Sequence, residues 1–122
     1  MIDDGKRLPV SFYQMTSGRV PVREWLKKLD AKERFVIGTD MKTVEYGWPV
    51  GMPVCEQLGN GLYAVRSHLP TRKIARVMFC IQDNEMILLH GFIKKSQKIP
   101  LRELELARKR KLDLEVQGNE EK

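Results

Sequence analysis

The sequence is poor in the residues that build metal and redox centres. It has two cysteines, Cys55 and Cys80, which lie too far apart for a metal knuckle and are too few for a disulfide framework. Its two histidines, His68 and His90, form no zinc-ligand pattern, and the stretch 59–61 lacks the spacing of a glycine-rich phosphate loop. We therefore expect that the protein binds neither a metal nor a cofactor. We also expect both cysteines to be structural thiols in a reducing compartment.

Long apolar runs are also missing. No segment approaches the ~20 consecutive apolar residues of a membrane span. Residues 1–9 carry four charged side chains where a signal peptide would need an apolar stretch, namely Asp3, Asp4, Lys6 and Arg7. We therefore expect a cytoplasmic protein.

Length and charge narrow the class further. The 122 residues, with 42% hydrophobic and 31% charged content, suit a single core, and we expect one domain over residues 1–116 and a disordered tail over residues 117–122. The net charge of +6 favours polyanionic partners. Charge alone does not choose among a ribosome, free RNA, DNA, an anionic membrane and an acidic protein.

The amino-terminal half predicts a short strand and two helices. The strand covers residues 10–15, and Pro21 suits the first turn of the helix that follows. Asp30 with Glu33 has the spacing of a capping box and starts a second helix that ends near Gly47. We expect these helices to form a hairpin.

The second half predicts an antiparallel meander and a last helix. Three apolar, partly alternating stretches separated by turn residues cover 62–66, 74–81 and 86–93, and Pro100 introduces the helix. The expected fold class is α+β: the helical hairpin packs on one face of a small antiparallel sheet, the other face stays open, and the carboxy-terminal helix lies at the rim.

Alternation along the strands divides their residues between two faces. One set is apolar: Tyr63, Val65, Val77, Phe79, Ile81, Ile87 and Leu89. The other set is expected on the open face: Leu62, Ala64, Arg66, Arg76, Met78, Cys80, Met86, Leu88, His90 and Lys94. The second set brings two arginines, a histidine and a lysine together. Such a cluster suits phosphate and the extra negative charge of a phosphoryl transition state, although a solvated charged face is an equally open interpretation.

Three segments together carry a family resemblance. They are Leu-Tyr-Ala-Val-Arg at 62–66, Ala-Arg-Val-Met-Phe at 75–79, and the run His-Gly-Phe-Ile-Lys-Lys-Ser-Gln-Lys-Ile-Pro at 90–100, followed by a helix rich in Ala, Arg and Lys. With these residues in this order, the sequence resembles the phage-derived HigB-like branch of the RelE/HigB toxins. Two positions depart from the family pattern, Ala64 and Ile99, and they affect expectations about rate and sequence preference.

The resemblance implies a RelE-like fold and the toxin of a type II toxin–antitoxin system. Such a toxin is a ribosome-dependent messenger RNA endoribonuclease that inhibits translation. Its implied partners are the ribosome, messenger RNA and a cognate antitoxin with a helix-turn-helix, HigA-like fold, with no membrane among them. The catalytic residues that the resemblance implies are Arg66, Arg76, Lys94 and Lys95. His90 is a further catalytic candidate, and the candidate RNA-binding residues are Arg72, Lys73, Lys98 and Arg108.

The expected reaction needs no metal. The substrate's 2′-hydroxyl attacks the adjacent phosphate and leaves a 2′,3′-cyclic phosphate and a 5′-hydroxyl. Arg66 and Arg76 would hold the phosphate, and Lys94 or Lys95 would donate a proton or orient the RNA. His90 is either an alternative acid or base or a hydrogen-bonded structural residue.

Two other classes of function stay open. The chain could be a noncatalytic, basic nucleic-acid-binding module, or a protein-interaction module whose basic end docks an acidic partner. A single-strand-binding module needs aromatic side chains for stacking, and we expect none on the open face of the three strands. This favours catalysis.

Overall fold

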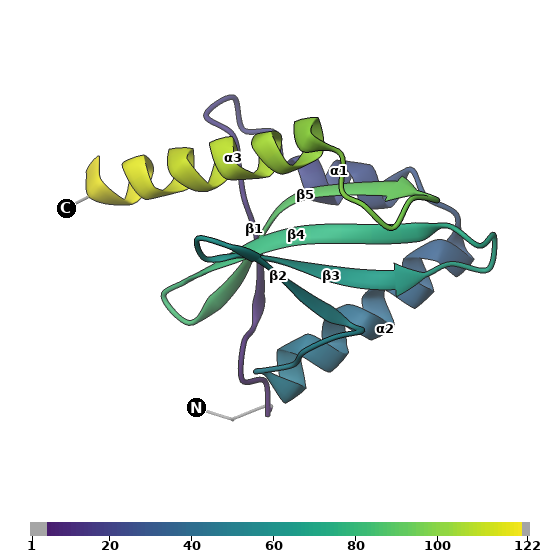
Figure 1. Ribbon diagram of the computed structural model, residues 1–122. Coiled ribbons are helices and arrows are strands. Elements are labelled where there is room, and N and C mark those ends of the chain that lie inside the picture. The colour runs from purple at the N-terminus through teal and green to yellow at the C-terminus, as the bar shows by residue number, and fades with distance from the viewer. Residues whose placement is uncertain (1–4, 121–122) are drawn as a thin grey trace.

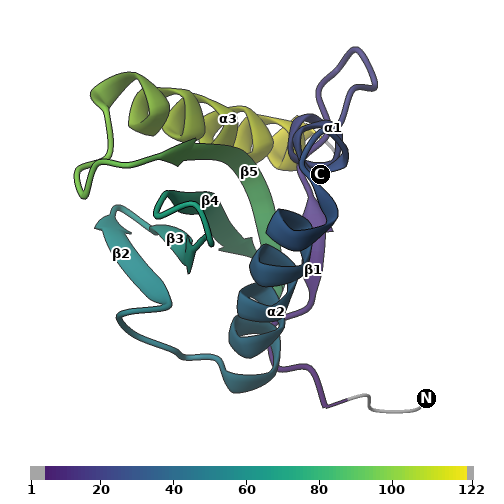
Figure 2. The same ribbon diagram turned by 90° about the vertical axis from the view of Figure 1, so that its right-hand side faces the viewer.

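The computed structural model describes residues 5–120. Two helices pack on one face of a five-stranded sheet and a third helix packs on the other face (Figures 1 and 2). The strand order in the sheet is β1-β5-β4-β3-β2. The elements, in chain order, are β1 (Val10–Phe12), α1 (Pro21–Lys27), α2 (Ala31–Gly47), β2 (Cys55–Gly59), β3 (Leu62–His68), β4 (Ile74–Gln82), β5 (Glu85–Lys94) and α3 (Leu101–Glu120).

The α+β class and the order of the predicted elements are confirmed, with two corrections to the sheet. Strand β2 was not expected, and it pairs antiparallel with β3. Strand β1 ends at Phe12 rather than at residue 15, and it pairs parallel with β5, so the sheet is mixed rather than wholly antiparallel. The long chain through α1 and α2 allows this, because parallel pairs need long connections.

Local sequence explains how α1 and α2 begin. Pro21 occupies the first turn of α1. The predicted capping box of α2 is present: the Glu33 amide donates to Asp30 Oδ1 over 2.8 Å, and the Asp30 amide donates to Glu33 Oε1 over 3.2 Å. These bonds satisfy amides that the first turn of a helix would otherwise leave free.

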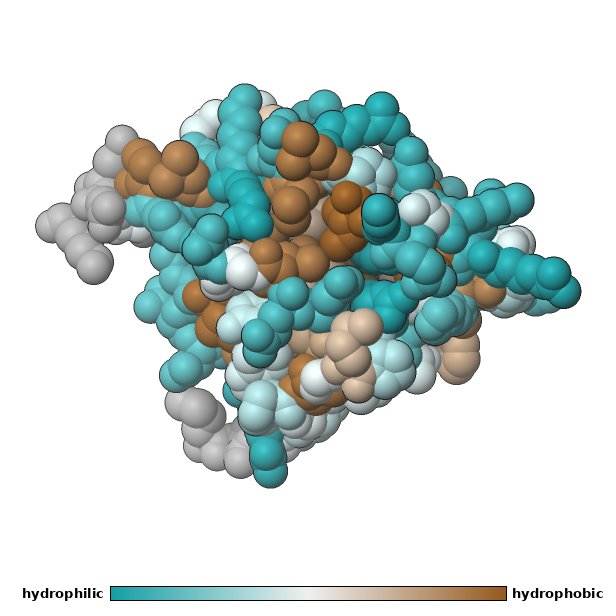
Figure 3. All heavy atoms as spheres, viewed as in Figure 1, coloured by the Kyte–Doolittle hydropathy of each residue, from teal (hydrophilic) through white to brown (hydrophobic). Residues whose placement is uncertain are grey.

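The prediction that one face of the sheet stays open is wrong, because α3 covers much of that face. Leu62, Ala64, Met78 and Cys80 are buried on this side with Ala107 of α3. Figure 3 shows apolar side chains beside α3 on this face, and polar side chains project at the end where β3 and β5 finish.

The face assignment within β5 needs a second correction. The β4–β5 register shifts by one residue between Met78 and Phe79, because a bulge interrupts the ladder. The first half of β5 is therefore inverted relative to the expectation. Met86 and Leu88 lie in the core on the α1–α2 side, and Ile87 and Leu89 lie under α3, in line with the rule that one extra residue exchanges the two faces.

Polar contacts tie α3 to the sheet. The Tyr13 hydroxyl donates to Asp113 over 2.6 Å, and Arg110 donates to the Leu89 carbonyl over 2.8 Å. The helix continues to Glu120, so residues 117–120 are helical instead of forming the expected tail, and residues 121–122 lie outside the described part of the chain. The long last helix is thus a structural layer of the domain.

The described helices include none that combines the length and the apolar character of a membrane span. Both cysteines are buried, and burial raises the pKa of Cys55 and of Cys80 to about 11. Thiols in such surroundings stay protonated and unreactive near neutral pH.

Candidate nucleic-acid interface

Two arginines form the centre of the candidate site. Arg66 of β3 and Arg76 of β4 are direct partners in the antiparallel register, on the α3 side of the sheet. Side chains at such paired positions start about 5 Å apart, so their like charges repel one another. We expected both to face solvent, and this is wrong: Arg76 is fully buried, and the Arg66 side chain is only 9% exposed.

A short stretch between β5 and α3 buries them. We call residues 95–98 the cover segment, and the connection that contains it passes in front of the sheet near the ends of β4 and β5 (Figure 1). Arg76 Nη1 donates to the Ser96 carbonyl over 3.1 Å, and its Nη2 donates to the Gln97 carbonyl over 2.7 Å. Arg66 Nη2 donates to Gln97 Oε1 over 3.0 Å. The charged N–H donors of both arginines are therefore hydrogen-bonded to neutral oxygens.

The two guanidinium groups have more positive charge than their surroundings balance. Glu56 Oε1 of β2 lies 3.9 Å from Arg66 Nε, which is an ion pair but not a hydrogen bond. Among the described residues, neither Arg66 Nε nor Arg76 Nε has a hydrogen-bond partner, although both atoms are buried. Burial, and then the neighbouring Arg66 charge, lowers the pKa of Arg76. One carboxylate faces two cations, so a single negative charge would complete the site.

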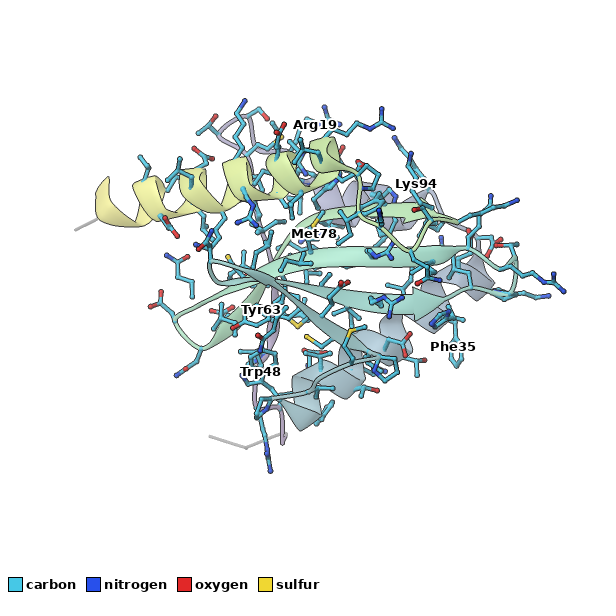
Figure 4. The ribbon with its side chains drawn as sticks, in the orientation of Figure 1. Arg19, Phe35, Trp48, Tyr63, Met78 and Lys94 are labelled. Atoms are coloured by element: carbon cyan, nitrogen blue, oxygen red, sulfur yellow. The ribbon has the colours of Figure 1, made fainter. Side chains whose placement is uncertain are left out.

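Further basic residues surround this pair. Lys94 is the last residue of β5 and is half-buried, and its backbone pairs with Ile74 at the start of β4 (Figure 4). Lys95 and Lys98 are exposed on the cover segment. Four of the predicted site residues thus lie with the arginines at the end of the sheet or on the β3–β4 loop beside it: Lys94, Lys95, Arg72 and Lys73.

His90 lies deeper, under α3. Its Nε2 is 3.0 Å from Glu103 Oε1, its Nδ1 is 3.4 Å from Arg110 Nη1, and its ring stacks on Phe92 at a centroid distance of 5.8 Å. Burial lowers the pKa of His90, and Glu103 opposes this shift. The imidazole is therefore neutral near pH 7 and engaged on both nitrogens.

Two other expectations concern aromatic residues, for which the prediction is wrong, and the candidate residue Arg108. Phe92 pairs with Arg76 on the face that we expected to lack aromatic residues, but it is only 7% exposed and offers no stacking surface. Arg108 donates to the Leu58 carbonyl over 3.1 Å. Since Leu58 lies at the far end of β2 from the residues that pair near Arg66, the structure places Arg108 apart from the arginine pair.

Sequence reasoning missed three partners of the arginines: Glu56, Ser96 and Gln97. Glu56 was missed together with β2. The signal for β2 was present, because Asn-Gly is the strongest two-residue hairpin signal, and Asn60 and Gly61 have φ of 53° and 76° between β2 and β3. Ser96 and Gln97 act mainly through backbone carbonyls, which no side-chain pattern reveals.

The chemistry that this arrangement offers is anion binding. Guanidinium groups match the oxygen geometry of phosphates, and lysines add positive charge around them. In the described part of the chain, no three His, Cys, Asp or Glu side chains gather as ligands for a metal ion.

Comparison with known proteins gives one finding. A family model described as phage-derived protein, Gp49-like, matches residues 24–112, which include α2, all of β2 to β5 and most of α3. No curated protein matches the sequence.

Proposed function

The chain belongs to the family of phage-derived Gp49-like proteins, and on this basis we propose that it is a toxin of a type II toxin–antitoxin system that cleaves messenger RNA on the ribosome. The resemblance to RelE/HigB toxins rests on the matched segment, which includes the paired arginines and the Lys94–Lys95 run. The proposed partners are the ribosome, messenger RNA and a helix-turn-helix antitoxin, and the proposed location is the cytoplasm.

The observation that carries this proposal is the unbalanced arginine pair. Buried charges are normally paired, because taking an ion out of water costs several kcal/mol. Arg66 and Arg76 share one carboxylate, Glu56, and each has a buried Nε that has no hydrogen-bond partner among the described residues. A phosphodiester has one negative charge and several acceptor oxygens, so it meets both requirements.

The proposed reaction uses a nucleophile from the substrate. The 2′-oxygen attacks the adjacent phosphorus, the bond from phosphorus to the 5′-oxygen breaks, and a cyclic phosphate and a 5′-hydroxyl result. The proton of the 2′-hydroxyl leaves to a base, and the 5′-oxygen takes up a proton. Arg66 and Arg76 would oppose the charge that develops on the phosphate, and Lys94 or Lys95 would protonate the leaving oxygen.

His90 fits a positioning role better than a role in proton transfer. Its ring nitrogens face Glu103 and Arg110 of α3, and its side chain is 14% exposed. The carboxylate beside the arginines, Glu56, is engaged in an ion pair with Arg66. We therefore propose that the ribosome supplies part of the substrate alignment and proton transfer, so that free RNA is a poor substrate.

The test is cleavage of one message with and without translating ribosomes. Wild type is expected to cut the ribosome-bound message and leave 5′-hydroxyl ends, while Arg66→Met/Arg76→Met is expected to lose at least a hundredfold in rate, as for one or more missing transition-state donors. Methionine preserves much of the side-chain volume, and circular dichroism would check that the variant folds.

A matched control removes two arginines elsewhere. Arg19 precedes α1, Arg23 lies within it, and both side chains are exposed and form no contact with the arginine pair among the interactions of the described residues. Arg19→Ala/Arg23→Ala is expected to cleave at the wild-type rate. Equal cutting by the Arg66/Arg76 variant, or equal rates with and without ribosomes, would contradict the proposal.

The alternative is a noncatalytic basic module that only binds nucleic acid or an acidic protein. The buried Phe92 argues against single-strand binding by stacking, because 7% exposure leaves no ring face for a base. Binding of the ribosome without new message ends would favour this alternative.

A further inference from the structure

We propose that the cover segment (residues 95–98) is a latch that fills the phosphate site with backbone carbonyls and opens when RNA replaces them. This inference rests on the proposed function, because it assigns the Arg66–Arg76 pair to an RNA phosphate. It adds a regulatory step: the closed form that the structure shows cannot bind the substrate.

The hydrogen bonds of the latch imitate those of a phosphate. The Ser96 and Gln97 carbonyls accept from the two terminal nitrogens of Arg76 over 3.1 and 2.7 Å. The Gln97 side chain supplies a third oxygen, to Arg66. Three oxygens thus converge on two guanidinium groups, as the oxygens of a phosphodiester would. Because Arg76 is fully buried under them, a phosphate reaches it only if these oxygens leave.

The cover segment can leave without unfolding the domain. Its four side chains are exposed, and it has no helical or strand structure. Its ends are held: Lys94 belongs to β5, and Ile99 packs against the core under α3. Within the described chain, its other hydrogen bond is internal and joins the Lys98 amide to Ser96 Oγ over 3.1 Å. The arginines are therefore its main attachment.

A phosphate is the better partner for these donors. Carbonyl oxygens carry only partial charge, whereas hydrogen bonds between charged groups are about twice as strong as neutral ones. Two closely spaced guanidinium groups also gain from a full negative charge, because their mutual repulsion is then compensated. Opening would also release the segment that carries Lys95 and Lys98, so these side chains could move onto the RNA backbone.

Competition between the cover segment and RNA predicts that one substitution increases the affinity for RNA instead of decreasing it. Gln97→Ala removes one of the three oxygens and weakens the closed form, so a larger fraction of molecules is open. The apparent affinity for RNA scales with that fraction, and we expect Gln97→Ala to bind about fivefold more tightly than wild type. Gln57→Ala is the matched control, because Gln57 is exposed on the edge strand β2, and it should bind as wild type does.

The experiment is a titration by nuclear magnetic resonance of the full chain with a six-nucleotide RNA whose 2′-hydroxyls are methylated. It follows the side-chain Nε–Hε signals of Arg66 and Arg76 and the amide order parameters of residues 95–98. The latch predicts that RNA shifts both arginine signals, that the order parameters fall below about 0.6, and that Gln97→Ala binds more tightly.

Two other results would overturn the latch and differ in what they mean for the proposed function. If the arginine signals shift while residues 95–98 stay ordered and Gln97→Ala binds no better, the arginines bind RNA with the segment in place. The phosphate site then stands and the latch fails. If RNA shifts the arginine signals neither in wild type nor in Gln97→Ala, the arginines do not bind the phosphate, and the proposed phosphate site fails together with the latch.

Discussion

At the scale of single residues, Arg76 is notable because a guanidinium ion is rarely buried. It has five N–H donors, and two of them are matched by carbonyls of the cover segment. A neutral oxygen compensates little of the cost of removing the charge from water. This side chain therefore adds little to the free energy of folding, because the cost of burying its charge offsets the hydrogen bonds that it makes to the cover segment.

Arg76→Met tests that view of the residue. Replacing a poorly compensated buried cation with an apolar side chain of similar volume is often neutral or stabilising. We expect the free energy of unfolding in urea to stay unchanged or to rise by about 1 kcal/mol. A loss of more than about 2 kcal/mol would mean that the bonds of Arg76 to residues 96 and 97 hold the fold together.

His90 predicts how stability depends on pH. Burial lowers its pKa in the folded protein, so the unfolded chain takes up a proton first as the pH falls. Glu103 and Arg110 both face the ring, and Glu103 only partly offsets this effect. The free energy of unfolding should therefore decrease as the pH falls below about 6.5 and level off below the folded pKa.

The measurement is urea unfolding of wild type and His90→Gln between pH 7.5 and 5.5. Glutamine does not titrate, so the variant should show a flatter profile in this window. His68→Gln is the control, because His68 is exposed at the end of β3, and it should keep the wild-type slope. An equally steep profile in His90→Gln would mean that other groups cause the pH dependence.

At the scale of elements, a glycine determines how closely α1 approaches β5. A Cβ built on Gly91 would lie 2.5 Å from Cε3 and Cζ3 of Trp25, which is too close for any carbon contact. The indole is part of the core on this side of the sheet, so it has little room to move. Gly91 is thus required by packing, beside a histidine that its predicted strand face had made a catalytic candidate.

Two alanine substitutions of opposite expected sign test this packing. Gly91→Ala should lower the free energy of unfolding by about 2 kcal/mol, because overpacking displaces Trp25. Gly38→Ala lies within α2, has open space at its Cβ position, and should raise it by about 0.5 to 1 kcal/mol through helix propensity. Urea unfolding measures both. An unchanged free energy of unfolding in Gly91→Ala would mean that α1 does not pack tightly against β5 at this position.

The elements also show which features the sequence could predict. The capping box of α2 and Pro21 of α1 act within a few residues, so their patterns revealed them. Strand β2 exists through its pairing with β3, and composition did not indicate it, because Pro53 precedes it and Gly59 is its last residue. The bulge in β5 inverted part of the face assignment, because it depends on register rather than on composition.

In the candidate site too, features set by local sequence could be predicted, and features set by tertiary contacts could not. That Arg66 and Arg76 share one face of neighbouring strands followed from strand alternation and the short loop between β3 and β4, whereas their direct pairing depends on the register. Their burial did not follow, because it is caused by the backbone carbonyls of Ser96 and Gln97 and by the side chain of Gln97, 20 to 31 residues away along the chain. Which side of the sheet α3 covers also depends on tertiary packing.

At the scale of the whole molecule, the question is whether the net charge of +6 acts as a diffuse field or through a local patch. Counterion release distinguishes these two cases. The logarithm of affinity for single-stranded RNA falls with the logarithm of salt concentration, with a slope of about −0.7 for each phosphate contact. A field that only attracts RNA at long range changes the association rate but adds no contacts of this kind.

Two triple variants with the same net charge test this difference. Lys94→Ala/Lys95→Ala/Lys98→Ala removes lysines at or beside the cover segment, and Lys27→Ala/Lys32→Ala/Lys42→Ala removes exposed lysines of α1 and α2, on the other side of the sheet. The first variant should make the salt dependence shallower by about 2, from three lost contacts. The second should leave the slope near the wild-type value, although both variants lose three positive charges. Titrations of a labelled RNA at several salt concentrations give the slopes, and equal slopes in the two variants would show that binding depends on total charge and not on the end of the sheet where Arg66 and Arg76 lie.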